Sequence, residues 1–288
     1  MDQALLQAPP SQHAWKQICD ALDALEGREL DKAIAEVDAA LEDWPDSQRY
    51  GNQWARSLAA NGAEPRLRVA RSLNLTGCRG SKTVIDSVAG SADIAHLKTL
   101  IFSLVPISPK KMKILAASPH LAGVEMMRFS MCYMKDTGFS HFSKSTTIQS
   151  LRRLEVGNNE LGERGGKIVA TAKTEVFSKL ESLSYANNKI GTAGCVHLAK
   201  AKLPTLRSLD LSRNEVGSDG PAALGGGTPR LAPAPPVKPS ESVNDSVNDP
   251  LAAASRRLAS AAAARSRARC SRRSRSPSAP PWCSWCGR

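Results

Sequence analysis

Leucines and asparagines recur at fixed spacing in the middle of this 288-residue chain, and this repeat limits what the chain can fold into. Three successive segments, beginning at Leu151, Leu180 and Leu206, follow the template L-x-x-L-x-(apolar)-x-x-N-x-(apolar)-G. Each is followed by a second glycine and then by another apolar residue. Because so many positions agree in three consecutive copies, we expect one structural unit to be repeated along the chain.

The template predicts the structure of that unit. Alternating apolar positions in L-x-x-L-x-L put the large side chains on one face of a short strand. The asparagine can satisfy backbone groups of the turn that follows, and stacked copies would align these side chains in a ladder. A helix-forming segment comes next, such as residues 194–201. A strand–turn–helix unit cannot bury its own apolar face, so it must stack on its neighbours.

Three weaker copies precede the clear ones. The first begins at Ala70, the second is assigned through Leu97 and Leu100, and the third through Leu121 and Val124. Since valine and phenylalanine offer no hydrogen bond, we expect looser turns in two of these copies, and we expect residues 132–150 to lengthen the third copy into an irregular helix or loop. This alignment places the following residues at the asparagine position: Cys78, Val105 and Phe129.

These repeats resemble the leucine-rich repeat family, in particular its ribonuclease-inhibitor-like class. The resemblance covers about residues 70–224 and is clearest over 151–224. It implies an α/β solenoid in which a curved parallel sheet lines a concave wall and helices form the outer wall. It also implies a binding scaffold, although a fold by itself does not specify a function.

The chain divides into three predicted parts: a helical N-terminal cap or interaction segment over 1–66, about six repeat units over 67–224, and a disordered basic tail rich in Pro, Ala, Arg and Ser over 225–288. In the first part, Ser11 is expected to cap a helix that ends at Gly27, and Asp31 to cap a second helix. A third helix is expected to carry an apolar set near the end of this part: Trp54, Leu58 and Leu67.

The charge is unevenly distributed along the chain. The net charge of +12 combines an acidic part over 1–66, with 6 basic and 12 acidic residues, and two basic parts: 67–224 has 22 against 12, and 225–288 has 11 against 3. Such asymmetry can indicate nucleic-acid contact, or only a solvated surface. Residues 265–275 could bind nucleic acid or a nuclear-import receptor, although a frame-shifted, unselected end is an alternative interpretation of the tail.

No catalytic or metal-binding motif appears in the sequence. Cys283 and Cys286 have zinc-type spacing, but only Cys270 lies nearby and no histidine follows His197. No phosphate-binding loop, G-x-S-x-G or H-E-x-x-H motif is present. We therefore predict a non-enzymatic protein without a cofactor, a metal or a small-molecule substrate.

The cellular setting is predicted from apolar segments and cysteines. No segment reaches the roughly 18 apolar residues of a transmembrane helix, so no membrane partner is expected. The N-terminus has no secretory signal, and the cysteines are odd in number, at 7. Both features favour a reducing, intracellular and cytoplasmic location.

The remaining candidate site is the concave wall, where exposed positions alternate with buried ones. We assign Gly123 and Arg153 to the first row of exposed positions, Glu125 and Glu155 to the middle row, and Arg128 to the row beside the ladder. Both charge signs and small hydroxyls suit a polar protein or peptide surface, although a solvated face without a partner stays an alternative. The candidate partner-binding residues are Glu125, Arg128, Arg153, Glu155, Asn158, Ser184, Asn187, Asp210 and Arg213.

The sequence thus predicts a non-enzymatic scaffold that binds another protein through its concave face. Two alternatives stay open. One is a nucleic-acid-associated protein that uses the basic repeats and tail. The other is a regulator of a GTPase, an activity found among ribonuclease-inhibitor-like repeat proteins, for which Arg128, Arg153 and Arg213 would be the available arginines.

Overall fold

The computed structural model describes residues 1–78 and 84–217. All the described residues belong to one compact unit. The predicted tail over 225–288, with its basic run at 265–275, lies outside the described residues. The same holds for the cysteine pair at Cys283 and Cys286.

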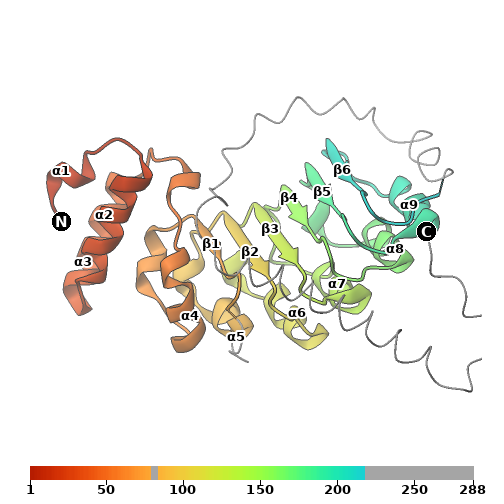
Figure 1. Cartoon of the computed structure of the whole chain (residues 1–288), viewed down its shortest axis with the longest axis horizontal. Helices are drawn as coiled ribbons and strands as arrows, with labels where there is room; N and C mark the ends of the chain where they lie inside the picture. Colours follow the sequence, from red (N-terminus) through yellow and green to blue (C-terminus); the bar gives the residue numbers. More distant parts are fainter. Residues whose placement is uncertain (79–83, 218–288) are drawn as a thin grey trace, which may run out of the picture. The chain divides into compact units, whose positions relative to one another are not determined.

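Within the described residues, the strands form one parallel 6-stranded sheet in the order of the chain (Figure 1). Each strand pairs with the strand of the next repeat, so the middle residues Leu100, Met127 and Leu154 are in register. Leu154, Leu183 and Leu209 continue the same register, which confirms the predicted parallel sheet. The strands are β1 (Ser72–Asn74), β2 (Thr99–Ser103), β3 (Met126–Ser130), β4 (Arg153–Glu155), β5 (Ser182–Ser184) and β6 (Ser208–Asp210).

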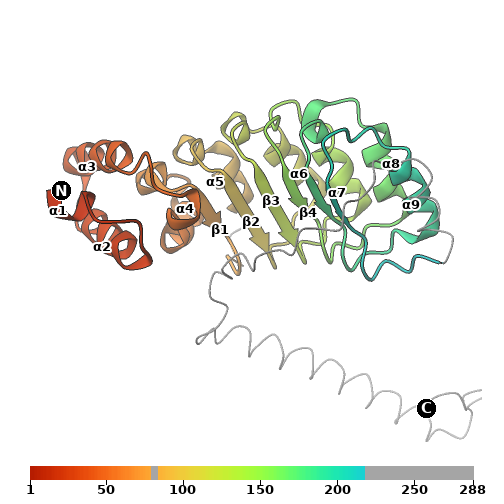
Figure 2. The same cartoon turned by 90° about the horizontal axis from the view of Figure 1, so that it is seen from above.

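Helices cover one face of the sheet and leave the other face open (Figures 1 and 2). The α-helices on the covered face are α4 (Ala55–Asn61), α5 (Val84–Gly90), α6 (Pro109–Ala116), α7 (Lys135–Phe142), α8 (Glu163–Thr171) and α9 (Gly191–Ala199). Short 3₁₀ helices complete the connections: η1 (Asp46–Gln48), η2 (Asn52–Trp54), η3 (Pro65–Val69), η4 (Ala92–Ile94), η5 (Pro119–Leu121) and η6 (Glu175–Phe177).

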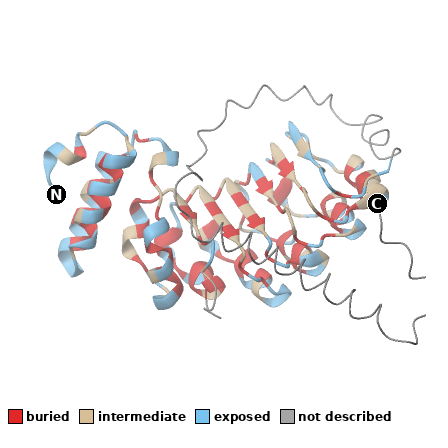
Figure 3. Ribbon diagram, viewed as in Figure 1, coloured by how far each residue is buried: buried red, intermediate tan, exposed pale blue. Residues whose placement is uncertain are grey.

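The core lies between the sheet and these helices (Figure 3). Leu73, Leu100, Met127 and Leu154 are fully buried on that side, while their neighbours along each strand are only partly buried or exposed. Leu209, in the last described strand, is only partly buried. One apolar face per strand is therefore buried by stacking of repeats, as the alternating pattern predicts.

The predicted asparagine ladder is present at Asn159, Asn188 and Asn214. Each side-chain amide donates to a carbonyl of the preceding repeat and to carbonyls of its own turn; Asn188 Nδ2 reaches Val156 O at 2.9 Å and Tyr185 O at 2.7 Å. Each side-chain oxygen accepts backbone N–H groups of the preceding repeat. The ladder thus satisfies turn groups that burial removes from water.

The third repeat is built differently from the sequence alignment. Met127, and not Val124, pairs with Leu154, so Cys132 occupies the ladder position and Phe129 is a buried strand residue. The Phe129 ring stacks on Phe102, with centroids 5.4 Å apart. The apolar template fits two registers that differ by three residues, one through Met126 and the other through Met127. Only the pairing with the next repeat distinguishes them.

This register also corrects the expected length of the third repeat. The interval from Cys132 to Asn159 is 27 residues, the same as from Val105 to Cys132, so residues 132–150 do not lengthen the third repeat. They hold the regular helix α7 instead. Cys132 retains part of the ladder function, because its Sγ lies 3.4 Å from Phe102 O and Ser130 O, within reach of a weak thiol hydrogen bond.

The N-terminal part contains α1 (Gln3–Leu6), α2 (Gln12–Asp23) and α3 (Gly27–Ala40). Ser11 caps α2 as predicted, since its hydroxyl accepts from Ala14 N at 3.1 Å. Gly27, with φ of +55°, begins α3 rather than ending α2. Asp31 is not a cap: it lies inside α3 and pairs with Arg68 at 3.4 Å.

The apolar set expected on a third helix is divided among three short elements. Trp54 ends η2, Leu58 lies in α4 and Leu67 in η3. All three side chains are buried, so the apolar pattern was correct, but the chain turns at Gly62 with φ of +77°. A glycine in this conformation ends α4 and breaks the expected helix.

A buried arginine connects the N-terminal helices to the start of the sheet. The Arg49 guanidinium donates to Val69 O at 2.9 Å, to Leu41 O at 3.0 Å and to the Asp38 carboxylate. Asp38 also accepts from Arg71 at 2.8 Å. Burial opposes ionisation of Asp38, but hydrogen bonds from the two arginines outweigh it and lower the pKa of the carboxyl.

Candidate protein-binding face

The face of the sheet opposite the helices, here called the open face, is the predicted concave wall. In register, its first row of side chains is Ser72, Thr99, Met126, Arg153, Ser182 and Ser208. Its middle row is Asn74, Ile101, Arg128, Glu155, Ser184 and Asp210. The shifted register of the third repeat therefore replaces Gly123 by Met126 in the first row and Glu125 by Arg128 in the middle row.

Neighbouring members of the middle row contact one another. Arg128 Nε lies 2.6 Å from Glu155 Oε2 across β3 and β4. The Ser184 hydroxyl donates to Asp210 at 2.9 Å across β5 and β6. Partial burial opposes the charge of Asp210, but hydrogen bonds from Ser212 and Ser184 outweigh it and lower the pKa of this carboxyl. These predicted residues are therefore brought together in pairs.

Glu125 belongs to a separate row, which the sequence analysis missed. This row consists of the residue directly before each strand, and its charges alternate in sign from Lys98 to Arg207. Glu125 pairs with Lys98 at 3.0 Å and with Arg152 at 3.9 Å, and Arg152 also pairs with Glu181. This pattern of charges becomes visible in the sequence only when the repeats are aligned in the correct register and the residue before each strand is compared between repeats.

The row beside the ladder, here called the rim row, consists of Leu104, Met131, Asn158, Asn187 and Arg213. All of them have φ between +53° and +60°. Arg128 was predicted here, but the register assigns Met131 to this place. Within the described part of the chain, Asn158 and Asn187 make no side-chain hydrogen bond, and Arg213 has no acidic partner.

Arg153 is another cation without a partner in the described residues. It is exposed at the start of β4, beside Ser182 and Met126. The open face thus combines internally paired charges with two unpaired arginines, Arg153 and Arg213. An unpaired arginine can bind a carboxylate of a partner directly, whereas a paired arginine must first break its ion pair within this chain.

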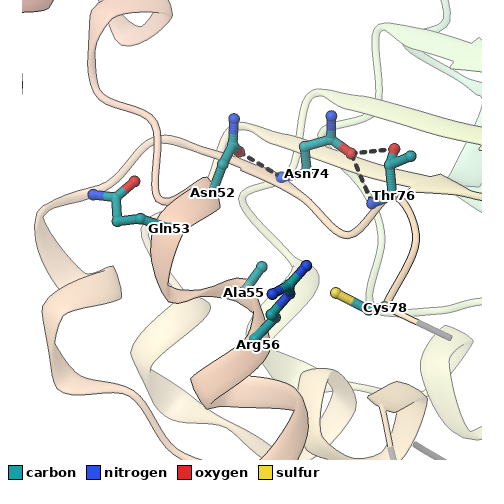
Figure 4. Close-up of a pocket in the computed structure, with 7 residues that line it drawn as sticks. All are labelled: Asn52, Gln53, Ala55, Arg56, Asn74, Thr76 and Cys78. Atoms are coloured by element: carbon teal, nitrogen blue, oxygen red, sulfur yellow. Dashed lines mark hydrogen bonds between the residues drawn. The ribbon is translucent and has the colours of Figure 1, made fainter. Parts of the chain in front are cut away.

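A small polar pocket lies at the N-terminal end of the sheet (Figure 4). Its volume is about 410 Å³. Two asparagines organise its wall: Asn52 Oδ1 accepts from Asn74 N at 2.9 Å, and Asn74 Oδ1 accepts from Thr76 N at 2.9 Å. Burial raises the pKa of the Cys78 thiol despite the nearby Arg56, so this thiol is a poor nucleophile. The lining residues are Asn52, Gln53, Ala55, Arg56, Asn74, Thr76 and Cys78.

The other titratable groups in the described ranges also give no sign of a reactive or metal-binding site. No group of three His, Cys, Asp or Glu residues there could hold a metal ion. Burial raises the pKa of Cys19 to about 12 and that of Cys132 to about 11, so both thiols are protonated at neutral pH. No helix in 1–78 or 84–217 is long and apolar enough to cross a membrane.

Comparisons with known proteins agree with this architecture. A family model described as "Leucine Rich repeat" matches residues 202–225. The chain is also similar to the ribonuclease inhibitor of Mus musculus, with 30% identity over 104 residues, and to that of Sus scrofa, with 34% identity over 92 residues. The chain is a leucine-rich repeat protein. Its repeats are of the ribonuclease-inhibitor-like class, which confirms the class predicted from the sequence.

The matches cover limited parts of the proteins compared. The two alignments with the ribonuclease inhibitors include 35% and 31% of this leucine-rich repeat protein, and it spans 23% and 20% of the length of those relatives. A solved structure of an internalin from Listeria monocytogenes matches with 18% identity and a TM-score of 0.26, over 66% of this chain and 68% of that chain.

Proposed function

We propose that this leucine-rich repeat protein is a non-enzymatic scaffold that binds another protein through the open face of its sheet. Proteins of this family typically serve as protein-binding scaffolds. The observation that carries the proposal is an uncovered sheet face lined by rows of polar side chains with both charge signs, including the unpaired Arg153. Such a surface has little to offer an apolar small molecule but suits a polar protein surface.

The N-terminal helices support this function by covering the first strand of the repeats. Arg49 holds α3 to η3, and Trp15 Nε1 donates to Tyr50 O at 2.9 Å. Tyr50 in turn forms a parallel bridge with Ser72 of β1. We propose that residues 1–66 act as the cap that a stacked repeat array needs at its open end.

Charge reversal on the open face tests the proposal. Partners would first be identified by affinity purification and mass spectrometry, with the full-length chain compared with residues 1–224. Arg153→Glu should then weaken binding of the purified partner about tenfold or more, because an opposed charge replaces an unpaired cation. It should leave the thermal midpoint nearly unchanged, since Arg153 is exposed.

A matched control uses a cation on the opposite side of the repeats. Lys167→Glu changes charge by the same amount on an exposed residue of α8. It should leave affinity within about twofold of the original. If neither Arg153→Glu nor Arg213→Glu changed the affinity, the open face would be excluded as the binding site.

An intracellular location is part of the same proposal. The four cysteines in the described residues, Cys19, Cys78, Cys132 and Cys195, are all free thiols. Thiols persist in a reducing compartment. Fractionation of cells that express the full chain would test this, and recovery only in the medium would contradict it.

A second candidate function is nucleic-acid binding. Several exposed lysines near the C-terminal ends of the outer helices have no acidic partner among the described residues. The phosphates of a nucleic acid would neutralise these lysines and reduce the repulsion between them. These lysines are Lys144, Lys173, Lys200 and Lys202. Salt-dependent retention on DNA or RNA that falls when these four lysines are replaced by glutamine would support this function, and loss only on deletion of 225–288 would assign it to the tail.

A further inference from the structure

Two large apolar side chains stand exposed at one edge of the open face. Met131 is 45% exposed and Tyr133 is 61% exposed. They flank the ladder residue Cys132, directly after β3. Within the described ranges, the Tyr133 ring stacks on no other ring and its hydroxyl makes no hydrogen bond. Packing among the described residues therefore does not account for either side chain.

The backbone at Met131 and Tyr133 adopts a conformation that large side chains disfavour. Met131 has φ of +53° and Tyr133 has φ of +52°. Bulky L-residues disfavour this left-handed region, whereas glycine and asparagine tolerate it. At the position of Met131 the other repeats hold Gly77, Leu104, Asn158, Asn187 and Arg213, and at the position of Tyr133 two of them hold Glu160 and Glu215. This φ therefore recurs in the repeat turn and does not require a large apolar side chain. Strain that brings no gain in burial is typical of a position kept for function.

The rim row continues from Met131 across the later repeats. Backbone N–H groups of the row donate to carbonyls of the following repeat: Met131 N to Gly157 O at 3.4 Å, and Asn158 N to Ala186 O at 3.1 Å. Asn187 N donates to Ser212 O at 3.0 Å. The side chains along this continuous edge are therefore apolar, amide, amide and cationic, in the order Met131, Asn158, Asn187 and Arg213.

We propose that this rim row selects the partner: it binds an extended protein segment that carries a large apolar side chain and, about four residues away, a carboxylate. The proposal rests on the proposed function of the open face. The apolar side chain packs on Met131 and Tyr133, and the carboxylate pairs with Arg213. Peptide groups between them contact the amides of Asn158 and Asn187.

Geometry sets the spacing of the two anchors. Met131 and Arg213 are separated by three strand intervals, about 14 Å at about 4.8 Å per interval. An extended chain covers that distance in about four residues at about 3.3 Å each. Charge complementarity sets the sign, because Arg213 has no acidic partner in the described residues.

The test begins with a phage-displayed library of random peptides selected on the full-length chain. The expected consensus has a large apolar residue and an Asp or Glu about four positions apart. Binding of a selected synthetic peptide is then measured by fluorescence anisotropy. Met131→Asn combined with Tyr133→Asn should reduce its affinity about tenfold or more, with a thermal midpoint equal to or above that of the original protein, since asparagine suits the backbone at both sites.

A charge exchange identifies the second anchor. Arg213→Glu should weaken the selected peptide, and a peptide with Lys in place of its acidic residue should recover affinity for this variant only. Lys167→Glu is the matched control and should change neither affinity. Recovery in the exchanged pair would not follow from general damage to the fold.

Several outcomes would overturn the proposal. The proposal is wrong if the selected peptides carry no carboxylate, or if their affinity is unchanged in the rim variants. If Arg153→Glu weakens binding while the rim variants do not, the rim inference is wrong and the open face keeps its proposed function. If neither set matters, both proposals fail. If the double variant instead converts a dimer into a monomer, the occupant is a second copy and not a peptide segment.

Discussion

Replacement of Asn188 by leucine tests the ladder that holds the repeats together. Asn188 is buried, with 5% exposure, and its Oδ1 accepts Asn159 N and Leu161 N, both at 3.0 Å. Its Nδ2 donates to Val156 O and Tyr185 O. Leucine is similar in size, so the substitution removes hydrogen bonds and leaves little cavity.

The magnitude follows from which groups lose their only partner. Val156 O retains Asn159 Nδ2 at 3.0 Å, and Tyr185 O retains Asn214 Nδ2 at 2.9 Å. Asn159 N and Leu161 N retain none among the described residues. An unsatisfied buried group costs about 1–3 kcal/mol, so two of them should lower the free energy of unfolding by about 2–6 kcal/mol.

Urea titration followed by circular dichroism measures this free energy, and the thermal midpoint should fall by several degrees or more. The matched control is Asn61→Leu, at an exposed asparagine whose hydrogen bond to Ser57 is open to water. It should change the free energy of unfolding by less than about 0.5 kcal/mol. If Asn188→Leu and Asn61→Leu gave the same small change, the ladder would not carry the stability assigned to it.

Three further predictions concern buried charge and thiols. Arg49→Met leaves Val69 O without its donor, whereas Leu41 O retains Trp44 N at 3.0 Å and Asp38 retains Arg71 at 2.8 Å, so the free energy of unfolding should fall by about 1–3 kcal/mol in urea titration. The folded-state pKa of Asp38 is lowered from 3.8, so its contribution to stability is present above that pH and is lost as the pH falls through the lowered value. Acid unfolding should accordingly be less steep in Asp38→Asn, and an unchanged slope would contradict the pairing. In the folded protein at neutral pH, iodoacetamide should modify half-buried Cys78 before Cys132, whose pKa burial raises to about 11, and peptide mapping gives the order.

The limits of sequence reasoning are clearest in the third repeat. Leu121, Val124 and Met126 satisfy the apolar template, and a frame shifted by three residues, through Met127, satisfies it equally well. Only the pairing of Met127 with Leu154 distinguishes them, because a one-strand pattern contains no information on its neighbour. The same error moved Arg128 one row away from its true place and hid Met131 from the list of candidates.

The ends of helices show a similar limit. Gly27 adopts the left-handed conformation that ends many helices, but here it begins α3. The local signal is real, because glycine, which has no Cβ, adopts this φ without strain. Its role is decided by the packing of α3 on η3, where Arg68 reaches Asp31, a contact between residues far apart in the sequence.

The sequence by itself determined the repeating unit, the buried leucines of the first two clear copies and the asparagine ladder at 159, 188 and 214, because each follows from residue spacing within a single repeat. Tertiary structure alone decided which side chains stand next to each other on the open face: the pairing of Arg128 with Glu155, the alternating row through Glu125, and the exposure of Met131 and Tyr133. The reason is physical. Neighbours across a parallel sheet are nearly thirty positions apart in the chain, so their contacts depend on strand register, which forms only when the repeats stack.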